Sequence, residues 1–417
     1  MNATTPRTSR RTFVTAGAAG LLFSSMVGSP AVAARGRKRA YVLVVDGCRP
    51  DEITPPLTPT LAALRDGGLN HPLARSMPVM ETIPNHVMMM TGLRPDRTGV
   101  PANTIYDRAL GETREMDRPR DIRSRTVIGR LNAAGFTTGT VLSKSYLFDI
   151  FGTRATHRWE PEPIVPISGH APDAFTMDAT LSMIEEFDPN LVFVNLGDVD
   201  RMGHADETGP VDVKALRQAA LADTDAQVSR FVDLLKSSGR WKNSVVIVLA
   251  DHSMDWSNPD QVISLTGPLE EDPFLAGKVQ IAQNGGADLL YWTGPRADRD
   301  RAVRRMRSIA AATPGVLAAH DRRADWLRLG PEAGEVVVYC RAGWRFTEPD
   351  PSGNPIPGNH GHPATKPIPF FVGGGHPVVP RRSASSEMAR TVDVAPTVGA
   401  FFGLGPPAGG YDGHNRL

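Results

Sequence analysis

Three apolar segments, each ending in acidic residues, place the strongest constraint on how this chain folds. They are RAYVLVVDG (39–47), LVFVNLGDVD (191–200) and NSVVIVLADHS (243–253). Apolar runs without polar alternation are typical of parallel strands that are covered on both faces. We therefore predict a buried, mostly parallel sheet with helices packed on both of its sides.

Helical patterns lie between these strands. One begins with Thr58 as the N-cap and Pro59 at the first helical position, and it ends at Gly67. Residues 126–143 predict a helix followed by a strand, and IPFFVGGG near Phe370 predicts another strand. Residues 212–238 form a long amphipathic pattern that ends before Gly239. Its predicted buried face consists of Leu216, Val228, Phe231, Leu234 and Leu235. Strands alternating with helices indicate an α/β fold with a doubly wound sheet.

The alternation is interrupted between residues 258 and 357. ADLLYWTG, ADRDRAVRRMRSIAAA, VLAAHDRR and GEVVVYC predict a strand, a helix and two further strands, which is a small α+β unit. We predict a cap of residues 258–357 inserted into a core of residues 38–257 and 358–417. The Arg-rich helix, 297–312, is interpreted as a solvated face with Asp298 and Asp300 as partners rather than as an anion site.

The first 33 residues are predicted to be an export signal. Arg10 and Arg11 precede a weakly apolar stretch, 13–27, and Ala31-Val32-Ala33 is a small-residue cleavage motif. This order is typical of a Tat signal peptide, which leads to the periplasm, the cell wall or the exterior. The alternative is an uncleaved anchor, although the stretch is short for a bilayer span. Because no other long apolar run follows, we expect no stable membrane anchor after cleavage.

Cysteine content and charge exclude several other classes. Cys48 and Cys340 are the only cysteines, so neither a disulfide scaffold nor a cysteine zinc site is expected. Two buried free thiols are favoured over a bridge. The net charge of +1 gives no indication of a surface that coats nucleic acid.

Potential metal ligands stand at the ends of the three apolar strands. Since the carboxyl ends of parallel strands meet at one edge of a sheet, these side chains are expected to converge. The motif GNHGHP adds His360 and His362. Carboxylates and imidazoles without thiolate suit Zn²⁺ or a similar divalent ion, and their number suits two ions better than one. The strand-end candidates are Asp46, Asp200, His204, Asp251 and His252.

A threonine turn, ETIPNHVMMMTG (81–92), lies between the first two strands. Read alone, Thr82 is an ordinary helix N-cap with Pro84 in the first turn. Beside a two-metal site it is also a candidate nucleophile, because a threonine hydroxyl needs activation at neutral pH. The two roles are compatible, since a helix N-terminus favours anions.

These motifs together resemble the alkaline phosphatase superfamily, and within it the nucleotide pyrophosphatase/phosphodiesterase and phosphonoacetate hydrolase branch. The resemblance begins near Tyr41 and is weakest across the insertion. T-x-P-N-H at the nucleophile turn is characteristic of that branch. The motifs are VVDGCRPDEI, METIPNHVMMMTGLRPDRTGVPANTIYD, GDVDRMGHADETGP, VLADHSMD, GNHGHP and RTVDVAPTVGAFFGL.

The resemblance implies a role for each motif residue. It implies one zinc ion on Asp200, His204 and His360, and a second on Asp46, Asp251 and His252, with Thr82 reaching both. Thr82 then forms a threonyl-phosphate, and Asn103 donates to a phosphoryl oxygen. His362 is implied to lie outside the ligand set, and Asn85 and His86 to brace the turn. The implied activity is hydrolysis of a small phosphodiester. Together with the predicted export signal, this indicates an exported hydrolase.

Two departures from the branch leave the natural substrate open. The oligomeric state is also left open by the sequence. Nucleotide-cleaving members carry an aromatic residue after the nucleophile to stack on the base, and here that residue is Ile83. Phosphonoacetate hydrolases carry two lysines that hold the substrate carboxylate, and here Lys144 is present but Tyr146 takes the second place. We predict that Lys144 contacts an anionic group of the substrate, with a solvated surface lysine as the alternative. A phosphonate hydrolase and a catalytically silent, metal-stabilised binding protein are the alternative functions.

Overall fold

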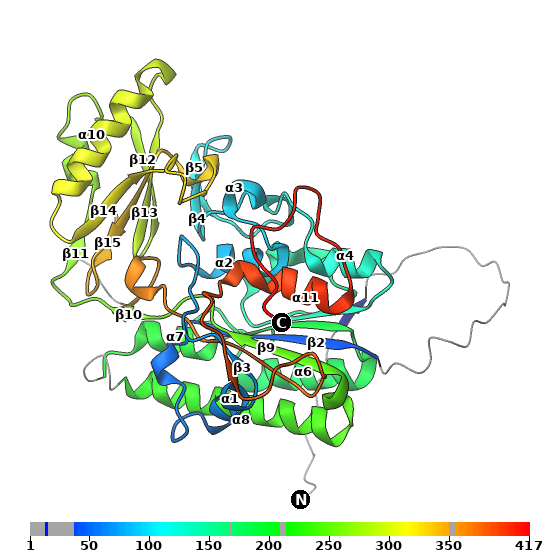
Figure 1. The fold of residues 1–417 in the computed structure, drawn as a ribbon. Coiled ribbons are helices and arrows are strands. Elements are labelled where there is room, and N and C mark those ends of the chain that lie inside the picture. The colour runs from blue at the N-terminus through cyan, green and yellow to red at the C-terminus, as the bar shows by residue number, and fades with distance from the viewer. Residues whose placement is uncertain (1–12, 16–36, 167, 209–213, 350–355) are drawn as a thin grey trace, which may run out of the picture.

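The computed structural model describes residues 13–15, 37–166, 168–208, 214–349 and 356–417. Within them the main layer is a nine-stranded sheet, in the order β1-β7-β6-β8-β2-β9-β18-β3-β19 (Figure 1). The run β7-β6-β8-β2-β9 is parallel, and β18 is antiparallel to β9. The strands are β1 (Phe13–Thr15), β2 (Arg39–Val45), β3 (Leu69–Asn70), β6 (Thr138–Leu142), β7 (His157–Trp159), β8 (Leu191–Leu196), β9 (Ser244–Leu249), β18 (Phe370–Gly373) and β19 (Ser383–Ala384).

The predicted apolar strands form the centre of this sheet. Strand β2 pairs with β8 and β9, so that Val42 stands opposite Phe193 on one side and Ile247 on the other. All residues of these three strands are buried. Burial on both faces explains why their sequences are continuously apolar, and the predicted doubly wound α/β fold is confirmed.

Helices cover both faces of the sheet. Helices α1 (Pro59–Gly67), α6 (Asp173–Phe187) and α8 (Ala215–Ser237) lie on one face, and α2 (Thr82–Thr91), α4 (Val127–Ala133) and α11 (Val394–Phe402) lie on the other (Figure 1). Helix α1 has Thr58 as its N-cap and Pro59 as its first residue, as predicted.

The predicted inner face of α8 was wrong at one position. Leu216 is 47% exposed, whereas Arg217 is completely buried. The buried stripe follows Arg217, Leu221, Val228, Phe231 and Leu235, which is the three-and-four spacing of one helix face. Leu216 lies beside this stripe because Arg217, paired with Glu52, occupies the inner position.

A second, antiparallel sheet lies within the region predicted as the cap. Its order is β12-β13-β15-β14, with α10 (Arg299–Ala312) packed against it. The predicted helix and three strands are present, and β12, half of whose sequence VQIAQN is polar, was not predicted. Among the predicted partners on α10, Asp300 pairs with Arg299 at 3.6 Å and with Arg323 at 3.2 Å. The strands are β12 (Val279–Asn284), β13 (Ala287–Trp292), β14 (Val316–Asp321) and β15 (Val336–Cys340).

Shorter elements connect the two sheets and carry the site. Strand β10 (Asp255–Trp256) pairs with β17 (Gly358–Asn359) where the chain enters and leaves the second sheet. The remaining elements are α3 (Pro95–Thr98), β4 (Thr104–Asp107), β5 (Glu112–Glu115), α5 (Ser145–Phe151), α7 (Asp198–Ala205), β11 (Val262–Ile263), α9 (Thr266–Glu270) and β16 (Arg345–Phe346).

Most of the predicted signal segment lies outside the described residues. Within it, β1 pairs with β7, with Phe13 opposite Trp159. This part of the segment therefore lies at the sheet edge in the full-length chain. Cys48 and Cys340 are buried and free, as predicted. Among the described residues, we find no helix of the length and apolarity that a membrane crossing requires.

Candidate active site

The strand ends converge as predicted. Asp46 follows β2, Asp251 and His252 follow β9, and α7, which follows β8, carries Asp200 and His204. His360 enters from the other side, directly after β17. The His252 and His360 rings stack with centroids 3.7 Å apart. The six side chains therefore form one cluster at the carboxyl edge of the sheet, in which five are buried and His204 is 22% exposed.

Three carboxylate oxygens in this cluster are buried and accept no hydrogen bond from the described residues: Asp46 Oδ1, Asp200 Oδ1 and Asp251 Oδ2. In each group the other oxygen is satisfied, for example by Asn195 on Asp46 Oδ2 and by the Gly47 amide on Asp251 Oδ1. Unsatisfied buried anionic oxygens are costly unless something positive binds them. The arrangement therefore fits divalent cations.

The histidines complete two ligand sets around these oxygens. His204 Nε2 lies 3.3 Å from Asp200 Oδ1, and His360 Nε2 lies 3.8 Å from the same atom. His252 Nε2 lies 3.3 Å from Asp251 Oδ2 and 3.7 Å from Asp46 Oδ1. These are the six residues that the sequence singled out as ligands. Asp200, His204 and His360 form one compact group, as the resemblance implied, whereas Asp46 groups both with Asp200 and His252 and with Asp251 and His86.

The opposite nitrogen of each imidazole is held by an acceptor. Nδ1 of His204 lies 2.8 Å from the Gly358 carbonyl, and Nδ1 of His252 lies 2.9 Å from the Ser253 carbonyl. Nδ1 of His360 lies 3.1 Å from Glu81 Oε1. Donation from Nδ1 leaves Nε2 as a lone-pair donor, which is the tautomer that a metal ligand requires.

Lys144 lies at the sheet edge as predicted, but inside the cluster. Its completely buried Nζ lies 2.9 Å from Asp46 Oδ2 and 2.7 Å from Asp200 Oδ2. Burial lowers the pKa of Lys144, but the carboxylates of Asp200 and Asp46 outweigh burial and raise it above its usual value. The alternative of a solvated surface lysine is wrong. Contact with a substrate anion stays a prediction, and these contacts favour a positioning role.

Thr82 lies beside the second ligand set. Its hydroxyl is buried and lies 3.2 Å from His252 Nε2. The predicted N-cap role is wrong: the N-cap is Glu81, whose extended backbone (φ −125°, ψ 157°) makes Thr82 the first helical residue. The Thr82 hydroxyl is thus directed to His252 at the N-terminus of α2, where the helix favours negative charge.

Asn103 and Asn85 hold this turn in different ways. Asn103 Oδ1 accepts the Ile83 amide at 2.8 Å, which leaves its amino group as the donor on the cavity side of the turn. Asn85 donates to the carbonyls of Met77, Val79 and Glu81, so its predicted bracing role is confirmed.

A cavity of about 230 Å³ opens over the cluster. Thr82, Asn103, His204 and His360 line it from the core, and Arg345 lines it from β16. The only aromatic residue in its lining is Tyr146. Ile83 is completely buried and faces the core instead.

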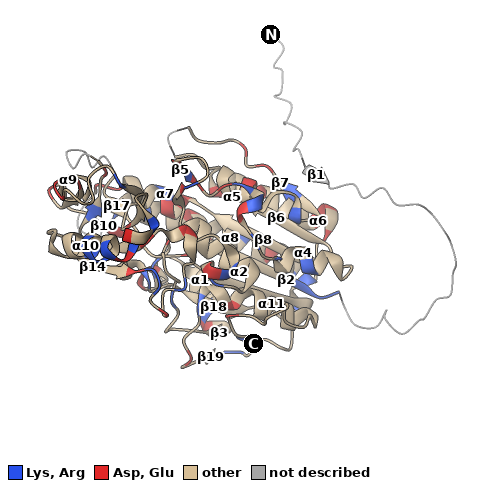
Figure 2. Ribbon diagram, turned by 90° about the horizontal axis from the view of Figure 1, so that it is seen from above, with Lys and Arg blue, Asp and Glu red and all other residues tan. Residues whose placement is uncertain are grey.

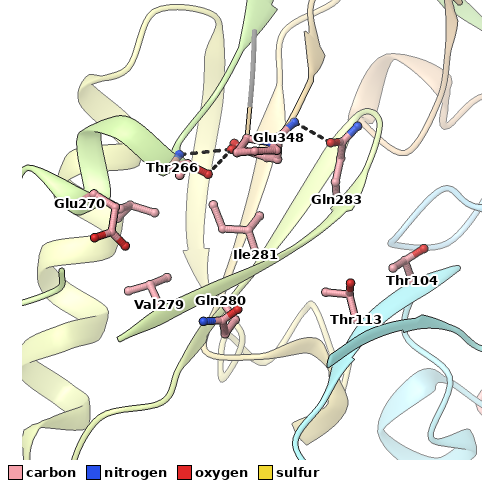
Figure 3. A pocket seen from close by; sticks show the side chains of 11 residues that line it. Thr104, Thr113, Thr266, Glu270, Val279, Gln280, Ile281, Gln283 and Glu348 are labelled. Carbon is pink, nitrogen blue, oxygen red and sulfur yellow. Dashed lines mark hydrogen bonds between the residues drawn. The ribbon is translucent and has the colours of Figure 1, made fainter. Parts of the chain in front are cut away.

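A larger cavity, about 460 Å³, lies between the second sheet and the β4–β5 hairpin (Figure 3). Its lining holds two carboxylates, Glu270, which is exposed, and Glu348, which already accepts from Thr266 Oγ1 at 2.5 Å and from the Thr266 amide at 3.2 Å. Its lining contains no histidine or cysteine. The larger cavity therefore offers no comparable reactive cluster.

Sequence reasoning missed several residues that shape the cluster. Glu81 bonds His360, and Asn195 bonds both Asp46 Oδ2 and His86 Nε2, at 2.7 and 3.0 Å. Because Asn195 donates to His86 Nε2, the proton of His86 is on Nδ1, which lies 2.9 Å from the Thr82 carbonyl. His86 thus braces the turn, as predicted. His362 bonds Asp255 at 2.9 Å, outside the ligand cluster.

Metal affinity is expected to rise with pH between about 7 and 9. Burial lowers the pKa of His360, but Glu81 and the site aspartates outweigh burial and raise it to about 9. Below pH 9 the metal-free protein therefore holds a proton that must leave Nε2 before a cation binds, which costs about tenfold in affinity per pH unit. Chelator competition with Zn²⁺ at several pH values measures this slope. Burial keeps the pKa values of His204 and His252 low, so they add no slope in this range. A flat profile contradicts the assignment.

Comparison with known proteins places this site in a family. The family model for type I phosphodiesterase / nucleotide pyrophosphatase matches residues 40–363. Human ectonucleotide pyrophosphatase/phosphodiesterase family member 5 is 22% identical over 374 residues, which cover 86% of this chain and 73% of that protein. Bovine bis(5'-adenosyl)-triphosphatase ENPP4 is 24% identical over 391 residues, covering 89% and 80%.

Two solved structures share the fold. An inactive murine ectonucleotide pyrophosphatase/phosphodiesterase 5, in complex with AMP, superposes with a TM-score of 0.73 at 17% identity, covering 91% of this chain and 97% of that one. Phosphonoacetate hydrolase from Sinorhizobium meliloti 1021, in complex with phosphonoformate, superposes with a TM-score of 0.67 at 19% identity, covering 88% and 95%.

The family match, together with the fold and the carboxylate–imidazole cluster, defines a metal-dependent phosphoric ester hydrolase of the alkaline phosphatase superfamily. Within that superfamily, the chain belongs to the type I phosphodiesterase / nucleotide pyrophosphatase family. The resemblance to this family that the sequence motifs indicated is therefore confirmed.

Proposed function

We propose that this chain is an exported two-metal hydrolase that cleaves small phosphodiesters through a threonyl-phosphate intermediate on Thr82. The observation that carries the proposal is the position of the buried Thr82 hydroxyl, 3.2 Å from His252 Nε2 and beside three carboxylates that each present an unsatisfied oxygen. A hydroxyl at such a place is a candidate nucleophile with an activating environment.

We assign two cations to the two ligand sets. Asp200, His204 and His360 hold one, and Asp46, Asp251 and His252 hold the other. Zn²⁺ suits this mixture of carboxylate and imidazole donors. When bound, such cations favour the ionised form of a nearby hydroxyl and offset charge that develops on a phosphoryl group.

The chain's own residues then carry the reaction. Thr82 Oγ1 gives up its proton and attacks phosphorus, and the ester bond to the leaving group breaks, so that the leaving alkoxide takes up a proton from solvent. The resulting threonyl-phosphate still carries the second ester arm. Water then hydrolyses it, which releases a phosphomonoester and restores the Thr82 hydroxyl. Asn103 donates its amino group to a phosphoryl oxygen, because its carbonyl oxygen is already held by the Ile83 amide. Losing one such donor costs about 2.7–4 kcal/mol of transition-state stabilisation.

Assays of the zinc-loaded protein on a panel of compounds test this function directly. The protein is assayed on chromogenic phosphodiesters, phosphomonoesters and a phosphonate, and diesters are expected to react fastest. Phosphonate cleavage is the second candidate, favoured by the absence of an aromatic residue after Thr82, where Ile83 is buried. No turnover of any compound by metal-loaded protein points instead to a silent binding protein.

Lys144→Met is expected to increase the dependence of folding stability on metal. The variant removes the cation between Asp46 and Asp200, and breaking a buried ion pair costs about 3–5 kcal/mol. Bound cations offset part of this loss, so the difference in unfolding free energy between metal-loaded and chelated protein should exceed that of the parent. Denaturant unfolding with and without chelator measures both.

The matched control for this experiment is Lys214→Met. Lys214 is also buried, but its Nζ donates to the Asp206 carbonyl at 3.1 Å and not to a site carboxylate. Its stability difference should stay that of the parent. If Lys144→Met leaves stability unchanged and affects only substrates with a second anionic group, the substrate-binding role predicted from the sequence replaces the positioning role.

Export by the Tat route remains part of the proposal. Its support is the order of Arg10-Arg11, the weakly apolar stretch and the Ala31-Val32-Ala33 motif. Because the Tat route carries folded proteins, it suits a protein that loads metal before leaving the cytoplasm.

A further inference from the structure

One cation at the cavity is not neutralised by a hydrogen-bonded carboxylate. Arg201 follows Asp200 on α7 and lines the cavity together with Thr82 and Asn103. Its Nε is buried and has no hydrogen-bond partner among the described residues. The Asp200 Oδ2 atom lies 3.9 Å from Nε, which is too far for a hydrogen bond. That oxygen is already bonded to Lys144.

Two buried arginines elsewhere in the chain are paired with carboxylates. Arg217 bonds both oxygens of Glu52, at 2.6 and 2.7 Å, and Arg416 bonds Asp393 at 2.6 Å. Arg201 instead donates to Tyr146 Oη at 3.2 Å, with its guanidinium carbon 5.9 Å from the centre of that ring. The Tyr146 side chain thus holds the guanidinium in place without neutralising its charge.

We propose that Arg201 is a specificity residue that binds a second anionic group of the substrate. The preferred substrates then carry an oxyanion, a carboxylate or a phosphate, on the arm beyond the reacting phosphorus. A guanidinium with an unsatisfied N–H matches either group, since it donates in a fixed planar geometry. This inference rests on the proposed function, because it assumes that the reacting phosphorus lies at Thr82.

The rest of the cavity is consistent with a second anion. Arg345 lines the same cavity from β16, so two guanidinium groups border it from the core and from the second sheet. Of the acidic residues in the lining, Glu81 pairs with His360 and Asp200 belongs to the ligand cluster. Glu115, exposed on β5, interacts electrostatically with Arg201 across the cavity, but no hydrogen bond joins the two side chains. The volume of about 230 Å³ suits a short arm.

The test uses para-nitrophenyl phosphodiesters that share one leaving group and differ in the other arm. A short alkyl arm ends in a carboxylate, a phosphate or a neutral carboxamide. For the parent, kcat/KM with an anionic arm should exceed that with the carboxamide arm by about tenfold to a hundredfold. The better of the two anionic arms identifies the group.

Arg201→Gln should bring this ratio close to one, and Arg201→Lys should restore part of it. Arg304→Gln alters an exposed arginine on α10, a helix labelled in Figure 2, where Lys and Arg are blue, and it should keep the parent ratio. A parent without preference for anionic arms, or an Arg201→Gln variant that keeps the parent ratio, overturns the inference while the diesterase function stands.

If no diester reacts, the proposed function fails separately. Calorimetric binding of a short alkylphosphonate with a carboxylate or a carboxamide end to parent and Arg201→Gln then still tests the inference. Selective loss of the carboxylate ligand's affinity supports it, and equal affinities overturn it.

Discussion

Thr82→Ala should reduce turnover of phosphodiesters by on the order of 10³–10⁶-fold, which is the effect of removing a covalent nucleophile in well-studied enzymes. The hydroxyl is the only group removed near the reacting phosphorus. Because the N-cap of α2 is Glu81, the substitution deletes no helix cap. The lost burial of one methyl group costs about 0.8 kcal/mol. Zinc content should remain that of the parent, measured by elemental analysis beside steady-state kinetics.

Two further variants make this result specific. Thr82→Ser keeps the hydroxyl and should retain part of the activity. Thr91→Ala makes the same change in the same helix, but Thr91 Oγ1 bonds the Val87 carbonyl, away from the cluster, so activity should persist. Acid quenching of the parent during turnover should yield a phosphorylated peptide that contains Thr82. A Thr82→Ala protein with near-parental turnover would show that the threonine is only structural.

Much of this architecture follows from local sequence pattern. An apolar run buried on both faces is recognisable without knowledge of its neighbours, and its carboxyl end is where parallel strands present side chains together. The convergence of Asp46, Asp251 and His252 is therefore predictable from the sequence alone. The family resemblance assigned His360 of GNHGHP to the ligand set, and the structure brings its Nε2 to 3.8 Å from Asp200 Oδ1.

What the sequence could not provide is the set of distant partners. Lys144 contacts Asp200 across 56 residues, and Asn195 contacts Asp46 across 149. Glu81 is an ordinary acid beside the threonine turn until β17 brings His360 within 3.1 Å of it. No periodicity encodes such contacts, because they depend on how the separate strands are ordered in the sheet.

Buried charge also explains the mistaken helix face. A pattern analysis places leucine inside and arginine outside, which made Leu216 the predicted core residue of α8. In the structure Glu52 lies where it neutralises Arg217, so the arginine occupies the inner position. A local hydrophobic pattern cannot anticipate a counter-ion that is supplied from 165 residues away.

Metal removal is expected to have the other large effect. Purified protein should contain about two divalent ions per chain. Chelation should abolish turnover and lower the unfolding free energy, because three buried carboxylate oxygens lose their partners. Each site contributes about 2.7 kcal/mol when the free ion is at a hundred times its Kd. Readdition of Zn²⁺ should restore both, followed by elemental analysis, thermal unfolding and diester hydrolysis.

His360→Gln and His362→Gln then form a matched pair within one motif. His360 Nε2 faces Asp200 Oδ1, so its loss should remove about one ion per chain and most of the activity. His362 is also buried but bonds Asp255, and glutamine can still donate there, so both ions should remain. Because both variants carry the same substitution two residues apart, a difference in metal content cannot come from general destabilisation. Equal metal content in the two variants would remove His360 from the ligand set, and full activity after thorough chelation would exclude the metal-dependent mechanism.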